Sequence, residues 1–139
     1  MFEFFQAWLV VLGAAMAVAG AAMVLVVGSP LLSPVLRLLD RPFWPNGPDE
    51  ATRRFQAFAY SVTFATMAGW GVAIALIAAN AFASRQAWAW WAIATSVALW
   101  YPLDTGRSLL HRVWANVALN TLVLVLVAIP LAATFGEMR

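Results

Sequence analysis

The sequence predicts an all-α integral membrane protein, a bundle of four transmembrane helices with a short interfacial helix in the first loop. Composition is the first reason, since 64% of the 139 residues are hydrophobic and only 10% are charged, against about 25% charged in soluble domains. Charge placement is the second, because charged residues fall in loops and at helix ends and leave four long apolar runs. A hydrocarbon core of about 30 Å needs about 20 such residues per helix, so a single transmembrane domain is expected over residues 1–139.

The first helix is expected over about residues 4–28, because Gly28, Pro30 and Pro34 follow a long run without charge. Its apolar stretch exceeds the roughly 7–15 residues typical of a signal peptide, so a retained helix is predicted. Small residues let helices approach closely in a membrane. This helix carries a stripe of them: Gly13, Ala17, Gly20 and Ala21. The stripe predicts either self-association or contact with another helix of the same chain.

A loop with a short helix is expected next. Residues 31–40 alternate apolar pairs with Arg37 and Asp40, a pattern typical of a helix that lies in the membrane surface. Proline and aromatic residues then form a turn, and Pro48 followed by Asp49 suits the start of a helix. The second transmembrane helix is therefore expected over about residues 48–82.

The third and fourth helices are expected over about residues 86–102 and 105–135. Aromatic residues at both ends of the third span form belts that fix its depth. Pro102 disfavours helix immediately before it, which makes Asp104 the N-cap of the fourth helix. Six of the eight arginines lie in the first and third loops. The positive-inside rule then places both termini on the side of the membrane away from the cytoplasm.

A polar stripe marks the candidate site. Five polar residues recur every four positions, which keeps them on one helical face: Asp104, Ser108, Arg112, Asn116 and Asn120. Residues of the second and third helices are expected at the same depth: Gln56, Tyr60, Thr63, Trp100 and Tyr101. Together they predict a polar ligand-binding pocket between the second, third and fourth helices, open to the cytoplasmic leaflet. The alternative is a structural polar core that joins the helices.

Composition argues against several classes of function. With no cysteine and with His111 as the single histidine, the chain lacks the spacings of common metal sites, and neither a metal nor another cofactor is expected. A net charge of +2 is too small to indicate nucleic-acid binding.

Three functions stay open. The leading prediction is a small non-enzymatic membrane protein, an accessory or interaction subunit that contacts membrane lipids and a larger membrane complex. One alternative is a protein that binds or transports a lipid or small ligand in the polar pocket. The other is an intramembrane enzyme with Asp104 and His111 as acid and base, seven residues apart and so on one face of a helix.

Several short motifs resemble those of an uncharacterised family of small four-helix bacterial inner-membrane proteins. They run from the first loop to near the end of the chain: Phe43-Trp44, Phe55-Gln56, Ala68-Gly69-Trp70-Gly71, Trp100 with Asp104-Thr105 and Ser108, Asn116 with Asn120, and Pro130-Leu131. The resemblance implies four transmembrane helices and a location in the bacterial inner membrane, so both termini are expected on its periplasmic side. It implies no activity.

Overall fold

The computed structural model describes residues 1–138 and consists almost entirely of helix. Helices account for 83% of the chain, and residues 1–138 contain no strand. In chain order the elements are α1 (Phe2–Val26), α2 (Ser33–Asp40), α3 (Glu50–Ile77), the π-helical turn η1 (Ala78–Phe82), α4 (Ala87–Leu110), α5 (Trp114–Thr134) and the 3-10 turn η2 (Phe135–Glu137). The all-α prediction is confirmed, and α2 is the short helix expected in the first loop.

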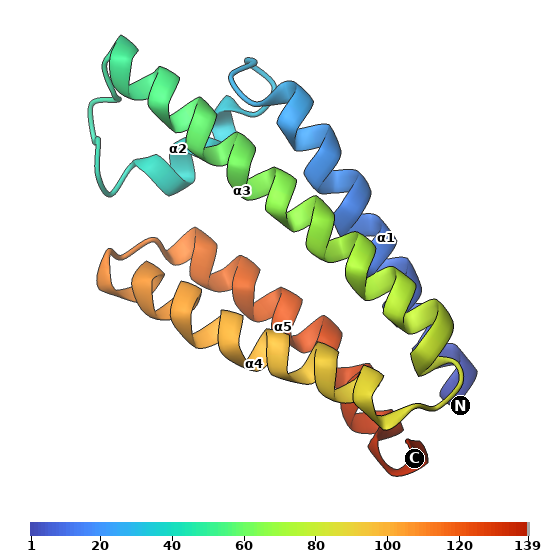
Figure 1. The fold of residues 1–139 in the computed structure, drawn as a ribbon. Helices are drawn as coiled ribbons and strands as arrows, with labels where there is room; N and C mark the ends of the chain where they lie inside the picture. The colour runs from blue at the N-terminus through green and yellow to red at the C-terminus, as the bar shows by residue number, and fades with distance from the viewer. Residues whose placement is uncertain (139) are drawn as a thin grey trace.

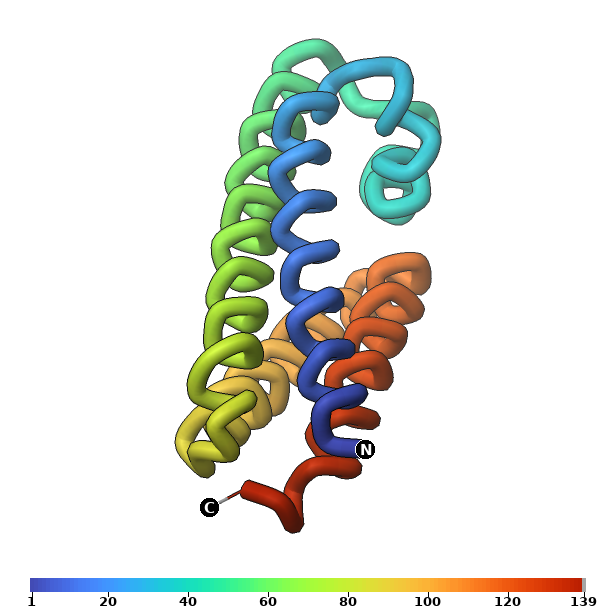
Figure 2. Tube along the Cα trace, turned by 90° about the vertical axis from the view of Figure 1, so that its right-hand side faces the viewer, coloured from blue at the N-terminus to red at the C-terminus, as the bar shows by residue number. Residues whose placement is uncertain are grey.

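The helices form two antiparallel hairpins that meet at one end and diverge toward the other (Figure 1). α1 pairs with α3, and α4 pairs with α5. Both termini lie at the end where the hairpins meet, whereas α2 lies at the opposite end (Figure 2). At that opposite end the ring of Phe43 lies 5.4 Å from the ring of His111. The first loop therefore contacts the turn that joins α4 to α5.

The hydrophobic core lies where the two hairpins meet. Leu9, Phe82 and Val127 are fully buried in it. Arg85, in the turn before α4, pairs with Glu137 at 3.1 Å, and its guanidinium also lies over an aromatic ring at the start of α1. These contacts connect the α3–α4 turn to both ends of the chain.

Glycine residues allow α1 and α3 to pack backbone against backbone. A Cβ atom on Gly71 would lie 2.5 Å from the Ala17 nitrogen, and one on Gly13 would lie 2.6 Å from the Ala75 nitrogen. Gly20 is equally close to α3. The stripe of small residues thus makes a contact within the chain, which is one of the two uses that the sequence allowed. Self-association through the same stripe stays a prediction.

Three helical segments are long and apolar enough to cross a membrane: Phe2–Val26, Glu50–Phe82 and Trp114–Glu137. They correspond to the first, second and fourth predicted spans. α4 has 24 residues but is not among them, because polar residues such as Thr95, Ser96 and Asp104 interrupt its apolar sequence. The three segments support a membrane location for the chain.

The boundary between the last two long helices differs from the prediction. α4 continues through Pro102 to Leu110, and α5 begins at Trp114, so the expected helix start at residue 105 is wrong. Proline is tolerated inside membrane helices because neighbouring groups compensate for the lost backbone hydrogen bond. The actual turn contains no glycine. Instead Arg112 takes the left-handed conformation, with φ 58°, and backbone bonds from residues 112 and 113 close a Schellman motif.

The start of α3 offers a test of pH dependence. The Asp49 carboxyl accepts a hydrogen bond from the Thr52 N–H at 2.7 Å, and this bond holds the pKa of Asp49 below its ordinary value. A lowered folded-state pKa stabilises the fold above the unfolded pKa, and the contribution is lost as pH falls through the folded pKa. The melting temperature should therefore decrease when the pH is lowered below about 4. The Asp49→Asn variant keeps a capping oxygen that does not titrate, so its melting temperature should decrease less. An equal loss in both proteins would assign the acid sensitivity to other carboxyl groups.

Candidate functional site

The polar stripe forms a compact cluster between α4 and α5. The Asp104 Oδ1 atom accepts hydrogen bonds from the side-chain amides of Asn116 at 2.7 Å and Asn120 at 2.9 Å. The Asn116 amide also donates to Ser108 Oγ at 2.8 Å, and the Asn120 amide donates to Thr105 Oγ1 at 3.2 Å. Three of these side chains are buried: Thr105, Ser108 and Asn120. The cluster thus joins the last turns of α4 to the first turns of α5.

Two facing helices, rather than one helical face, carry the stripe. Asp104 and Ser108 belong to α4, Asn116 and Asn120 belong to α5, and Arg112 is exposed in the turn between them. Asp104 is therefore not an N-cap, as the sequence predicted, but an interhelical acceptor near the end of α4. The side-chain amides of the cluster bond to groups of the same cluster. This arrangement fits a structural core better than a ligand-binding pocket.

The aromatic and hydroxyl residues expected around the stripe lie elsewhere. The Tyr101 hydroxyl lies 3.2 Å from Thr121 Oγ1, and the Trp100 ring lies 5.4 Å from the Trp70 ring. Thr63 is exposed and donates to a carbonyl one turn earlier in its own helix. None of these three contacts involves the Asp104 cluster.

The expected acid–base pair is not joined by a hydrogen bond. The Nε2 atom of His111 lies 3.3 Å from an Arg107 nitrogen, whereas the Asp104 carboxyl accepts hydrogen bonds from α5. Across residues 1–138, no cluster of three histidine or acidic side chains is placed to hold a metal ion. At this end of α4, Asp104 therefore connects two helices and does not form a pair with His111.

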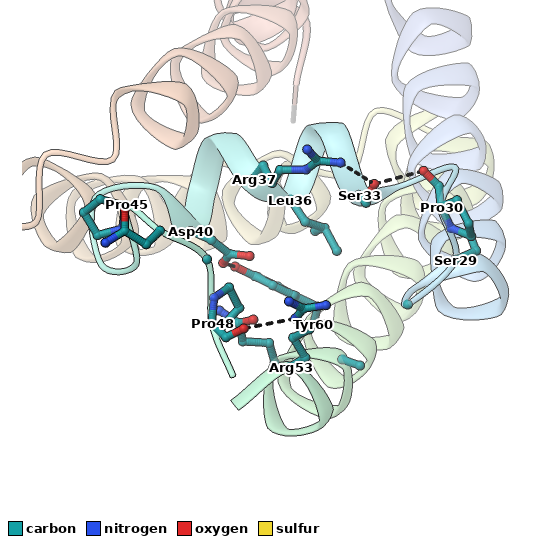
Figure 3. Close-up of a pocket in the computed structure, with 15 residues that line it drawn as sticks. Ser29, Pro30, Ser33, Leu36, Arg37, Asp40, Pro45, Pro48, Arg53 and Tyr60 are labelled. Atoms are coloured by element: carbon teal, nitrogen blue, oxygen red, sulfur yellow. Dashed lines mark hydrogen bonds between the residues drawn. The ribbon is translucent and has the colours of Figure 1, made fainter. Parts of the chain in front are cut away.

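A separate cavity lies between the end of α1, α2 and the start of α3 (Figure 3). Its volume is about 740 Å³, within the range of roughly 300–1,000 Å³ typical of small-ligand sites. Two of the predicted site residues, Gln56 and Tyr60, line it. Other polar lining residues were not among the predicted site residues: Ser29, Ser33, Arg37, Asp40 and Arg53.

A buried contact holds α2 over the start of α3. The Tyr60 hydroxyl donates a hydrogen bond to the Asp40 carboxyl, and Asp40 is only 9% exposed. Figure 3 shows the Tyr60 side chain reaching across to Asp40 at the end of α2. This bond fixes α2 as one wall of the cavity.

Two buried polar atoms in the cavity lining have no hydrogen-bond partner. Ser29 Oγ and Gln56 Nε2 are shielded from solvent, and neither bonds to any residue in the described part of the chain. A buried polar group left unpaired costs about 1–3 kcal/mol, so such groups are few in folded proteins. Both residues contribute other atoms to the cavity lining, so a rotation of either side chain would bring its polar atom to a molecule held there.

Two arginines give the cavity a positive character. Arg37 donates to Ser33 Oγ at 3.2 Å, and Arg53 donates to the Pro48 carbonyl at 3.0 Å (Figure 3). A guanidinium has five N–H donors, so each arginine keeps several for another partner. Asp40 is the one acidic residue in the lining. The cavity is therefore suited to a polar or negatively charged group.

One residue of the sequence does point to this cavity. Asp40 closes a segment that is otherwise apolar or basic, and a carboxyl that becomes buried there needs a partner. Tyr60 is that partner, but it lies 20 residues away on another helix. Helical periodicity within either segment does not reveal the pairing.

Comparisons with known protein families, with curated proteins and with solved structures found no match to this chain. The resemblance to small four-helix bacterial membrane proteins stays a prediction.

Proposed function

We propose that this protein is a non-enzymatic, four-pass protein of the bacterial inner membrane that binds a lipid or small ligand in the cavity between α1, α2 and α3. One observation carries the proposal: Ser29 Oγ and Gln56 Nε2 are buried without partners in the lining of a cavity that also holds two arginines. A bound molecule toward which these two side chains rotate removes the cost of the unpaired groups. An accessory or interaction subunit, the leading prediction from the sequence, leaves them unexplained.

α4 is the proposed fourth span because it is bonded to α5 near both of its ends. The Trp90 indole donates to the Leu131 carbonyl at 2.8 Å, and Asp104 accepts from Asn116 toward the other end. α5 is apolar enough to cross a membrane, so an antiparallel helix bonded along it lies at the same depth. The 24 residues of α4 extend over about 36 Å at 1.5 Å per residue, enough for a core of about 30 Å.

Arginine placement supports an orientation with both termini on the periplasmic side. Both termini lie at one end of the structure, whereas α2, the start of α3 and the α4–α5 turn lie at the other (Figure 1). These three segments, the loop after α2 and the last turn of α4 carry six of the eight arginines. The positive-inside rule assigns the arginine-rich end, and the cavity with it, to the cytoplasmic side.

The Gln56→Leu variant tests the proposal because it separates binding from folding. Leucine has a similar size and removes the unpartnered amide, so the melting temperature of the delipidated protein should rise or stay unchanged. The same change should reduce the amount of small molecule that native mass spectrometry detects on protein purified in a mild detergent.

Gln86→Leu is the matched control, because Gln86 is exposed before α4 and lies outside the cavity. It should retain the bound molecule to the same extent as the unmodified protein. Unchanged retention in Gln56→Leu, or an equal loss in both variants, would count against a ligand in this cavity.

A further inference from the structure

The cavity between α1, α2 and α3 has an excess of hydrogen-bond donors. Arg37 and Arg53 bring two positive charges against the single carboxyl of Asp40, which already accepts a hydrogen bond. The unpartnered Gln56 Nε2 atom is a donor, and the unpartnered Ser29 hydroxyl is able to donate. A group that complements this lining carries negative charge and several acceptor oxygens.

The cavity lies at the depth expected for lipid headgroups. α1 ends at Val26 and α3 begins at Glu50, and the cavity lies between these two helix ends. Headgroup phosphates occupy the zone immediately outside the hydrocarbon core. α2 also exposes Val35 and Leu38, apolar side chains suited to contact with acyl chains.

Side chains, rather than a helix end, would provide the recognition. The N-terminus of α3 is already capped, because Asp49 accepts the Thr52 N–H, and Asp49 is not among the residues that line the cavity. A guanidinium is planar and presents paired N–H groups that match two oxygens of a phosphate. Arginine is therefore the residue type best suited to bind such a group.

We propose that this cavity binds a phosphate group, supplied either by the headgroup of an anionic phospholipid or by a soluble phosphorylated compound. Arg37 and Arg53 donate to phosphate oxygens, and Gln56 and Ser29 rotate to pair with further oxygens of the same ligand. The inference rests on the proposed binding function and adds the chemical class of the ligand. A cavity of about 740 Å³ has room for the group esterified to the phosphate.

Titration in a phosphate-free maltoside detergent tests this class of ligand. The probes are dioctanoyl phosphatidylglycerol, dioctanoylglycerol with the same acyl chains but no phosphate, and inorganic phosphate. Native mass spectrometry and the shift in melting temperature report binding. Dioctanoyl phosphatidylglycerol should bind at least about tenfold more tightly than dioctanoylglycerol, because the charge-assisted hydrogen bonds need the phosphate.

Arginine variants test the assigned residues. The double variant Arg37→Gln with Arg53→Gln should weaken phosphatidylglycerol binding at least about tenfold. Arg53→Lys keeps the positive charge without the planar guanidinium, so it should weaken binding less. Arg54→Gln is the matched control, since Arg54 pairs with Glu50 at 3.1 Å, is 80% exposed and does not line the cavity. Its affinity should stay within about twofold of the unmodified protein.

The outcomes distinguish this inference from the proposed function. Binding of phosphatidylglycerol without binding of inorganic phosphate supports a lipid ligand, and stabilisation by inorganic phosphate supports a soluble one; both support phosphate recognition. Ligand retention that depends on Gln56 but not on Arg37 and Arg53 would overturn the phosphate class and leave the binding function standing. Retention that none of the cavity variants changes would overturn both.

Discussion

Replacing Gly71 with leucine is expected to break the α1–α3 pair and to cost at least about 3 kcal/mol of folding free energy, the upper part of the range for overpacked cores. Even a Cβ atom here would lie 2.5 Å from the Ala17 nitrogen and 2.6 Å from the Gly13 carbonyl oxygen. Both are backbone atoms, which cannot change rotamer to make room. The helices must therefore separate, and close packing is the main force that holds helices together in a membrane.

Gly69→Leu is the matched control, two residues away on the same helix. Its Cβ would meet nothing within 4 Å, and both changes replace a glycine inside a helix, so their difference isolates the clash with α1. Unfolding by sodium dodecyl sulfate in mixed micelles, followed by tryptophan fluorescence, measures both. Similar stabilities would show that α1 and α3 do not approach as closely as the structure describes.

The same glycines show what the sequence can and cannot specify. Small residues on α1 predict a close helix contact in a membrane, and that contact exists. Its partner depends on the rotation of α3, which decides that Gly71 is buried and Gly69 is exposed. Rotation follows from packing along the whole helix, so local sequence does not separate the two glycines.

Helix boundaries, too, were predictable only where the local sequence carries a signal for them. Length and hydropathy correctly placed the helices that begin and end at loops rich in proline, glycine and charge. The α4–α5 turn carries charge but neither proline nor glycine, because Arg112 occupies the left-handed position that glycine usually takes. Pro102, which looked like a boundary, lies inside α4.

Two residues of the predicted site, on the second predicted span, line a cavity whose other residues are not the ones that the sequence suggested. Gln56 and Tyr60 do line a polar cavity, yet that cavity is completed by α2 rather than by α4 and α5. The hydrogen bond from Tyr60 to Asp40 positions α2. A contact between two segments that lie far apart in the sequence depends on the whole fold and is not visible in either segment. The stripe on α4 and α5 paired with itself because a turn inside it brought its two halves together.

Replacing Asp104 with leucine is expected to destabilise the α4–α5 hairpin by about 2–4 kcal/mol. The change removes the acceptor shared by the Asn116 and Asn120 amides. Each amide keeps its bond to Ser108 or Thr105 but loses the partner of its other N–H, at about 1–3 kcal/mol for each buried group left unpaired. Asp104→Asn keeps an acceptor oxygen and should cost less. Unfolding in mixed micelles measures the effect, with Thr63→Leu as a control, because Thr63 is exposed and bonds only within its own helix.

The decisive variant removes the carboxyl and both amides by combining Asp104→Leu, Asn116→Leu and Asn120→Leu. The two amide donors and their shared acceptor then disappear together, whereas Ser108 keeps its bond to the Asp104 carbonyl; an apolar replacement of buried polar groups is often neutral or stabilising. Recovery of most of the stability lost in Asp104→Leu would show that the cluster connects two helices and that the single variant suffers from unpaired groups. A triple variant as unstable as the single one would mean that the polar groups contribute more than their mutual hydrogen bonds. The case for a binding role at α4 and α5 would then be renewed, separately from the cavity under α2.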